Sequence, residues 1–250
     1  MKTTRIVLIL STLLFLCVTS VRADFVGFEI GASYWEPELT GSFASVGDPS
    51  IDLVGDLGLE DITPSNLVLT LEHPIPLLPN IKYQNMDLDS TGSNMLSNAI
   101  DFNGSNFPIG STVNSTFDLS HNDIVLYYEL LDNWISLDFG LDIKIFDGGV
   151  SLDDGVSTAS EPIDETMPLL YLSARFDLPF SGFYIGADLI GASTGDNSLE
   201  DTSLMLGYES DSGLGIEGGI KKFSLEINDV TDINADLEYD GVYLNGYYHF

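Results

Sequence analysis

The sequence predicts an all-β fold, namely a transmembrane antiparallel up-and-down β-barrel, and three observations lead to it. Segments in which every second side chain is apolar recur along the chain, and two residues is the repeat of a strand. The connections between these segments alternate between short and long, as in bacterial outer-membrane barrels. The chain opens on a segment typical of exported proteins. Ten strands are expected, and eight or twelve stay open because residues 37–63 are long enough to hold further strand.

The first segment has the parts of a secretory signal peptide. Lys2 and Arg5 form a positive start, residues 6–18 are apolar, and a loose small-residue cleavage pattern follows. We therefore expect residues 1–23 to be a cleaved signal peptide and residues 24–250 to be a single outer-membrane β-barrel domain. An uncleaved anchor helix is the alternative, but the apolar run is short for a bilayer span.

The only cysteine, Cys17, lies within this predicted signal peptide. The residue before it is Leu16, which is not the small residue that a lipoprotein signal requires, so we do not expect lipidation. Without cysteines, the exported chain would gain no stability from disulfides.

The charge balance is strongly acidic. Loss of Lys2, Arg5 and Arg22 with the predicted signal leaves five basic side chains against 39 acids, a net charge of −34. Nucleic acid and anionic lipid surfaces are poor partners for such a chain. Hydrophobic residues make up 44% of the sequence, which is too many for a disordered acidic protein. The apolar residues must therefore form either a core or a membrane-facing belt.

The clearest strand is predicted over residues 133–146. Six apolar side chains, from Ile135 to Ile145, occupy alternate positions there, whereas a helix would scatter them around its axis. Residues 80–89 hold the weakest strand, because their apolar side chains do not keep one parity. The same alternation predicts strands within residues 25–35, 66–72, 123–131, 169–178, 182–191, 203–209, 213–223 and 241–250.

The predicted connections fall into two groups that alternate along the chain. The short ones are residues 73–79, 131–133, 178–182 and 210–213. The longer or acidic ones are residues 37–63, 91–115, 147–166, 195–199 and 228–234. An even number of strands puts both termini on the side of the short turns, which is periplasmic in outer-membrane barrels. The expected location is therefore the outer membrane of a Gram-negative bacterium, with both termini periplasmic.

The apolar face of each predicted strand is expected to contact lipid. A spanning sheet must close into a barrel, because every backbone polar group needs a partner inside the bilayer. Tyr34, Tyr128 and Tyr208 lie on the apolar face and are expected in an aromatic girdle at the membrane interface. Tyr248 and Phe250 join this girdle. A final Phe preceded by apolar residues at alternate positions also resembles the signal that the barrel-assembly machinery reads.

The chain resembles a family of small proteobacterial outer-membrane β-barrel proteins in residues 27–43, 71–83, 119–141, 174–182 and 237–244. The resemblance extends over nearly all of the chain after the predicted signal. It implies the barrel fold and the outer membrane. It implies no mechanism, because the family has no assigned activity.

If the apolar face contacts lipid, the opposite face lines the barrel interior. Four cations among nine acids there predict buried ion pairs of Lys144, Arg175 and Lys221 with carboxylates on neighbouring strands. Because ten strands leave little interior space, a filled, structural lumen is favoured over a narrow passive cation-preferring channel. The expected lumen-lining charges are Glu29, Glu72, Lys82, Glu129, Asp138, Asp142, Lys144, Arg175, Asp177, Asp188, Glu209, Glu217 and Lys221.

A hydrolase is one alternative function, and it would depend on His121. This residue is expected at the outer rim beside Asp123, with Asp87 and Asp89 on the neighbouring strand, and such groups can activate water. The cluster resembles that of surface proteases built on ten-stranded barrels, but in those enzymes two pairs of residues face each other across a cleft, whereas here they would lie on adjacent strands. We therefore expect that the chain is not an enzyme, with no catalytic and no metal-binding residues.

The remaining expectations concern partners. They are outer-membrane lipid, lipopolysaccharide and the barrel-assembly machinery, with no nucleic acid, no cofactor and a monomeric state. Carboxylates crowd the longer connections, and divalent cations that bridge them to lipopolysaccharide phosphates are a hypothesis. A surface-loop binding protein or adhesin using residues 37–63 or 91–115 stays open, as does a soluble periplasmic sandwich.

Overall fold

The computed structural model describes residues 26–45, 47, 49–75, 77–230 and 233–250. The predicted signal peptide, residues 1–23, lies outside these described residues. Strands are the regular elements of the described chain. No helix in this part of the chain is long and apolar enough to cross a bilayer.

Ten strands close into an antiparallel barrel, which confirms the predicted fold class and the predicted number of strands. The last strand pairs with the first from Glu29 opposite His249 to Ser45 opposite Ile233, so the sheet closes on itself. The ten barrel strands are β1 (Gly27–Ser45), β3 (Ser65–Glu72), β4 (Asn80–Met86), β9 (His121–Asp132), β10 (Ile135–Phe146), β13 (Thr166–Asp177), β14 (Phe183–Thr194), β15 (Asn197–Glu209), β16 (Leu214–Val230) and β17 (Ile233–His249).

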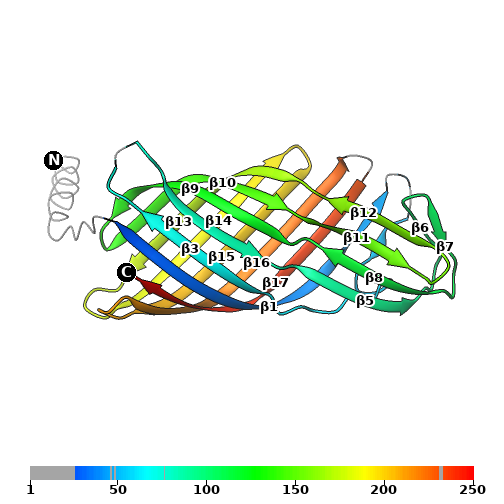
Figure 1. Ribbon diagram of the computed structural model, residues 1–250, viewed down its shortest axis with the longest axis horizontal. Coiled ribbons are helices and arrows are strands. Elements are labelled where there is room, and N and C mark those ends of the chain that lie inside the picture. The colour runs from blue at the N-terminus through cyan, green and yellow to red at the C-terminus, as the bar shows by residue number, and fades with distance from the viewer. Residues whose placement is uncertain (1–25, 46, 48, 76, 231–232) are drawn as a thin grey trace, which may run out of the picture.

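The two ends of the barrel differ (Figure 1). The short connections gather at one end, which we call the turn end, where β1 begins and β17 finishes. At the other end the wall of strands continues past the ends of β4, β9, β10 and β13, and we call this part the extension. The turn-end connections are residues 73–79, 133–134, 178–182 and 210–213.

The extension is built mainly of strands. After interruptions of one or two residues, four strands continue β4, β9, β10 and β13 and pair in a four-stranded sheet. The prediction that residues 91–115 and 147–166 are loops is therefore largely wrong. These continuations and the smaller strands beside them are β2 (Ile51–Asp52), β5 (Asp89–Met95), β6 (Ile100–Phe102), β7 (Ser105–Phe107), β8 (Thr112–Asp118), β11 (Gly148–Asp153) and β12 (Thr158–Ile163).

Apolar side chains change sides along the strands, and β1 shows this most clearly. Up to Tyr34 the exposed side chains of β1 are mostly apolar, and from Glu36 onward they are mostly polar. The inward side chains do the reverse, since Ser33 is polar whereas Trp35, only 1% exposed, begins an apolar series. The sequence left a core and a membrane belt as alternatives, but the molecule has both, one after the other along its axis.

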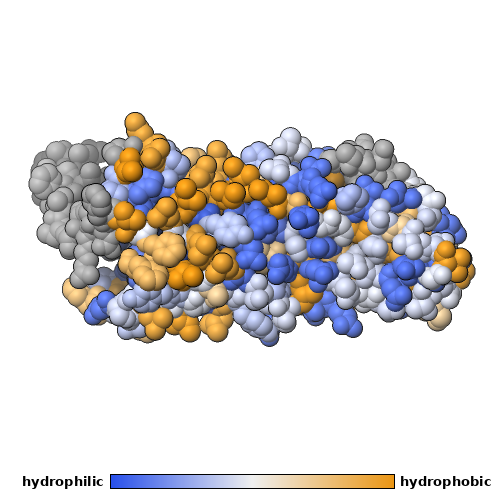
Figure 2. Space-filling view, in the orientation of Figure 1, coloured by the Kyte–Doolittle hydropathy of each residue, from blue (hydrophilic) through white to orange (hydrophobic). Residues whose placement is uncertain are grey.

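The belt surrounds the half of the barrel near the turn end. All ten barrel strands contribute to it, with exposed fractions of 39–61% for large apolar side chains. Figure 2 shows this apolar surface at the turn-end half and a mostly polar surface over the extension. The belt includes Phe28, Ile30, Leu67, Leu71, Ile81, Tyr128, Leu130, Phe139, Leu141, Leu170, Leu172, Ile185, Leu189, Leu204, Leu206, Leu214, Ile216, Ile220, Val242 and Leu244.

Aromatic side chains lie at both margins of the belt. At the turn end the Tyr128 hydroxyl donates a hydrogen bond to the carbonyl of Leu77, and the rings of Tyr248 and Phe250 lie 4.6 Å apart. Tyr34 lies at the opposite margin, where the outward face of β1 becomes polar. This is the placement that interfacial aromatic residues take in outer-membrane barrels.

The extension encloses an apolar core. Leu53, Phe107 and Leu152 have no exposed surface, and together with other inward side chains they form one continuous hydrophobic cluster. Phe43 contacts the rings of Phe102 and Phe117 within this cluster, so the β6–β7 hairpin packs over the inside of the wall. The interior of the extension is therefore filled by side chains.

Candidate functional site: a charged vestibule and the layer that closes it

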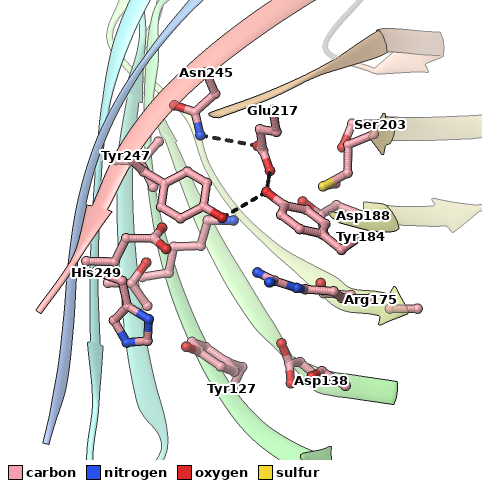
Figure 3. A pocket seen from close by; sticks show the side chains of 18 of the residues that line it. Tyr127, Asp138, Arg175, Tyr184, Asp188, Ser203, Glu217, Asn245, Tyr247 and His249 are labelled. Carbon is pink, nitrogen blue, oxygen red and sulfur yellow. Dashed lines mark hydrogen bonds between the residues drawn. The ribbon is translucent and has the colours of Figure 1, made fainter. Parts of the chain in front are cut away.

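A cavity of about 410 Å³ occupies the barrel interior within the belt, and we call it the vestibule. All ten barrel strands contribute to its lining, which reaches Asp132 and Asn133 at the turn end. Trp35, Gln84 and Met86 lie at its inner end. Figure 3 shows side chains from several strands converging on this space.

The vestibule carries a large excess of acid. Nine carboxylates line it, against the three cations Lys82, Arg175 and Lys221 and the imidazole of His249. Of the thirteen predicted lumen charges, Asp142 and Lys144 lie deeper in the wall with no exposed surface. The other eleven line the vestibule: Glu29, Glu72, Lys82, Glu129, Asp138, Arg175, Asp177, Asp188, Glu209, Glu217 and Lys221.

Near the turn end, Arg175 is held by two acids and a ring. Its Nε donates to Oδ1 of Asp177 at 2.9 Å, and its Nη2 donates to Oε2 of Glu209 at 3.2 Å. Its guanidinium lies 3.7 Å from the centre of the Tyr184 ring, which adds a cation–π contact. Glu209 also accepts a hydrogen bond from the Tyr247 hydroxyl at 3.1 Å.

A second network crosses the vestibule from β14 to β17 (Figure 3). The Tyr184 hydroxyl donates to Oε2 of Glu217 at 2.6 Å, and the hydroxyl oxygens of Tyr247 and Tyr184 lie 3.0 Å apart. Nδ2 of Asn245 donates to the other oxygen of Glu217 at 3.2 Å. This network links three strands of the wall from inside the barrel.

Glycines on neighbouring strands make room for these two tyrosines. Tyr184 pairs with Gly207 and Tyr247 pairs with Gly215 across adjacent strands. A Cβ atom at either glycine would lie 2.1 Å from the Cζ atom of the opposite ring. The rings therefore lie flat against the wall only because these positions have no side chain.

The vestibule ends at a polar layer, which we call the central layer and which consists of Gln84, Asp123, Asp142, Lys144, Asp201 and Lys221. All of these residues are buried except Lys221, which lines the vestibule. Nζ of Lys144 lies 2.7 Å from Oδ1 of Asp123 and 3.9 Å from Oδ2 of Asp201. Nε2 of Gln84 donates to Oδ2 of Asp123 at 2.6 Å, and Nζ of Lys221 lies 3.1 Å from Oδ1 of Asp201. The layer therefore links β4, β9 and β10 to β15 and β16.

His121 lies on the extension side of this layer and not at the rim, so the predicted rim cluster is wrong. It is 2% exposed and packs between the rings of Phe146 and Phe223, at centroid distances of 5.2 and 5.6 Å. Asp87 and Asp89, its predicted partners, are exposed on the outside of the wall. The reason is that β8 leads directly into β9, so the wall extends well beyond His121.

One group of possible metal ligands occurs here. Ligand atoms of His121, Asp123 and Asp201 lie within 4.8 Å of one another, and all three residues are buried. Sequence reasoning missed Asp201, although it has the inward parity of β15 two residues before Ser203. The sequence predicts Asp123 only for the rim cluster and Lys144 only for the lumen, so it does not predict that the two side chains pair.

The acidic connections use several carboxylates to stabilise their own turns. Oδ1 of Asp52 accepts hydrogen bonds from the backbone amides of Val54 and Gly55. The backbone amides of Ser157 and Val156 donate to the carboxylate of Asp154 and lower its pKa. Divalent cations bridging these connections to lipopolysaccharide stay a prediction.

The comparisons with known proteins identify the fold. No protein-family model matches the chain, and no curated protein sequence matches it. The outer-membrane protease OmpT from Escherichia coli is similar in structure, with a TM-score of 0.51 and 11% identity over 93% of this chain and 99% of that one. A Pseudomonas aeruginosa FadL homologue has a TM-score of 0.41 and 10% identity, over 90% of each chain. The transport unit of the Escherichia coli autotransporter AIDA-I has a TM-score of 0.39 and 10% identity, over 94% of this chain and 92% of that one.

The likeness to OmpT bears on two expectations. OmpT is an outer-membrane protein built on a similar barrel, so the likeness agrees with the predicted fold class. The expectation that the chain is not an enzyme does not hold, because an outer-membrane protease is built on a similar barrel. At 11% identity the likeness shows the fold alone and assigns no activity to this chain.

Proposed function

We propose that the chain is an integral outer-membrane barrel with a sealed lumen, which holds the stranded extension at the surface of a Gram-negative cell. The turn end would face the periplasm and the extension would face outward. The extension would then serve as a structural or binding element outside the membrane. Any binding surface would be formed by the loops and strands of residues 37–63 and 91–115.

The observation that carries this proposal is the burial of the charged side chains at the centre of the layer. Lys144, Asp123 and Asp142 have no exposed surface, which supports a central layer without a solvent-filled passage. Beyond the layer, the apolar core fills the extension. A hydrated ion would have to separate buried ion pairs and then cross an apolar interior, and both steps are unfavourable.

The position in the membrane is supported by the belt and the closed wall. Exposed apolar side chains on all ten strands match a hydrocarbon environment. Closure of β17 on β1 satisfies the backbone groups that an open edge would leave unpaired in lipid. Short periplasmic turns and longer external segments are the usual arrangement, which favours a periplasmic turn end and an external extension.

A narrow cation-preferring channel is the second candidate. The excess of carboxylates over cations in the vestibule favours it, because acidic walls attract cations. Conduction would require the central layer to open.

Conductance of the refolded protein in a planar lipid bilayer tests the proposal. A sealed lumen predicts a silent membrane at moderate voltage, with insertion verified by a gel shift between boiled and unboiled samples. Steady cation-selective steps that shrink in Asp138→Asn would overturn the sealed lumen and establish the second candidate.

A further inference from the structure

The wall of the vestibule carries a row of polar side chains that are neighbours on successive strands. Asp138 on β10 pairs with Glu129 on β9 and with Ser173 on β13, and Ser173 pairs in turn with Asp188 on β14. Residues paired across strands point to the same side of a sheet, which here is the vestibule. We call this set the polar row, and it consists of Glu129, Asp138, Ser173, Asp188, Ser203 and Lys221.

The polar row runs from the mouth of the vestibule to its inner end. Glu129 lies near the turn end of β9, whereas Lys221 pairs with Asp201 of the central layer at 3.1 Å. Neighbouring strands lie about 4.8 Å apart, so the three carboxylates of the row, on β9, β10 and β14, extend over about 14 Å of the curved wall. The row therefore presents its acceptors along a line rather than around one point.

The cations of the vestibule leave most of its acids without a partner of their own. Arg175 is held by two of the nine lining carboxylates, and Lys221 pairs with the central layer. Lys82 acts on Asp138 and Asp188, but it also acts on further lining acids. A single ammonium therefore faces the other seven carboxylates of the lining.

Two acceptor atoms of the lining also lack a donor. Oδ1 of Asp138 is buried and has no hydrogen-bond partner in the described chain. The same holds for Oδ1 of Asn245, a lining residue that is only 9% exposed. Buried acceptors of this kind are costly unless a donor reaches them. The vestibule therefore has room for a ligand that brings both positive charge and N–H groups.

The lining carboxylates are dispersed, which does not suit a metal ion. In the described part of the chain, ligand atoms of three acidic or histidine side chains come within 4.8 Å of one another at His121, Asp123 and Asp201, and none of these lines the vestibule. A hard metal ion needs several oxygens around one point. An elongated cation with donors at intervals fits the polar row better.

Two tyrosine rings lie beside the polar row. Gly140, two residues beyond Asp138 on the same face of β10, pairs with Tyr127 on one side and with Tyr171 on the other. The two rings lie 5.8 Å apart, and the ammonium of Lys82 lies 5.7 Å from the centre of the Tyr171 ring. Aromatic faces attract ammonium groups and offer apolar contact to methylene groups.

We propose that the vestibule binds a linear aliphatic polyamine, whose ammonium groups donate to Glu129, Asp138 and Asp188 along the polar row. The methylene links between the ammonium groups contact the rings of Tyr127 and Tyr171. A cavity of about 410 Å³ lies in the size range of small-molecule sites. The apolar belt around the barrel strengthens the attraction between the acids and a cation, because it is a medium of low dielectric constant.

A groove at the turn end gives a polyamine its route into the vestibule. It lies between the connections 178–182 and 210–213, and it shares Arg175 and His249 with the lining of the vestibule. Entry by this route does not cross the central layer. The polyamine site therefore does not depend on a sealed lumen, and the two proposals can fail separately.

Isothermal titration calorimetry of the protein refolded in a zwitterionic detergent tests the site, with spermidine as the probe. We expect saturable binding of one equivalent. Asp138→Asn and Asp188→Asn should each raise the Kd about tenfold, because each removes a charged acceptor and keeps the shape of the side chain. Glu38→Gln is the matched control, since Glu38 lies on the exposed face of the extension and should change the Kd by less than about twofold.

A compact trication separates recognition of an extended amine from simple attraction of charge. Hexaamminecobalt(III) has the charge of spermidine and also carries N–H donors, but it cannot extend along the polar row, so it should bind more weakly. The proposal is overturned if spermidine gives no saturable heat, if both row variants keep the wild-type Kd, or if hexaamminecobalt(III) binds as tightly as spermidine. If the variants do not refold, the wild-type comparison of the two trications still decides.

Discussion

The ammonium nitrogen of Lys144 lies 2.7 Å from Oδ1 and 2.9 Å from Oδ2 of Asp123, and neither side chain has any exposed surface. The pair joins β9 to β10 inside the barrel, at the boundary between the polar vestibule and the apolar core. In the proposed sealed lumen, this pair is the contact that separates the two ends.

Lys144→Met should therefore be strongly destabilising. It removes one partner of a buried pair and leaves Asp123 without its cation, which costs about 3–5 kcal/mol in comparable cases. The midpoint of urea unfolding from detergent measures the effect. Lys222→Met is the control, because its pair with Glu238 (2.7 Å) is exposed and should contribute under about 1 kcal/mol. Equal effects of the two substitutions would contradict a larger contribution from the buried pair.

Gly207→Val should disturb the wall of the vestibule. Its Cβ would lie 2.1 Å from Cζ of Tyr184, so the ring must move and lose its hydrogen bond to Glu217. Overpacking of this kind costs about 1–3 kcal/mol. Gly246→Ala is the control, since its Cβ would meet no atom within 4 Å. The fraction of protein that refolds, read from the gel shift on boiling, should fall for the first substitution and not for the second.

Leu141→Lys should impair insertion into lipid. Leu141 is 51% exposed in the middle of the belt, and a lysine on the lipid face costs about 2–4 kcal/mol near the bilayer midplane. Thr40→Lys, on the exposed face of the extension, should insert as well as the wild type. Refolding yields into phosphatidylcholine vesicles compare them. If Leu141→Lys refolds as efficiently as Thr40→Lys, the belt does not contact lipid.

Most of the wall could be predicted from the sequence. The alternation of residues 133–146 needs only the geometry of a strand, and β10 occupies Ile135–Phe146 as expected. The extension could not be predicted in the same way. Beyond residues such as Tyr34 the apolar side chains change face, so the strands of residues 91–115 and 147–166 have polar outward faces and were expected as loops.

The contents of the lumen were only partly predictable. Parity placed Asp142 and Lys144 inward, because a strand sends alternate side chains to the same face. Parity does not indicate which strands face each other across the barrel, so the contact of Lys144 with Asp201 could not be foreseen. Parity also does not indicate how deep a residue lies along the barrel axis, so the sequence predicts His121 at the rim.

The sealed lumen is tested most directly by access of a charged thiol reagent from each side of a lipid vesicle. Cys17, within the predicted signal, is the only cysteine, so Ser203→Cys in the vestibule and Ser193→Cys on the exposed extension can be labelled singly. In a sealed barrel, reagent added on the side that modifies Ser193→Cys does not modify Ser203→Cys. Ser203→Cys reacts only with reagent added on the other side of the vesicle. Modification of both from the same side would show an open path through the central layer and contradict the sealed lumen.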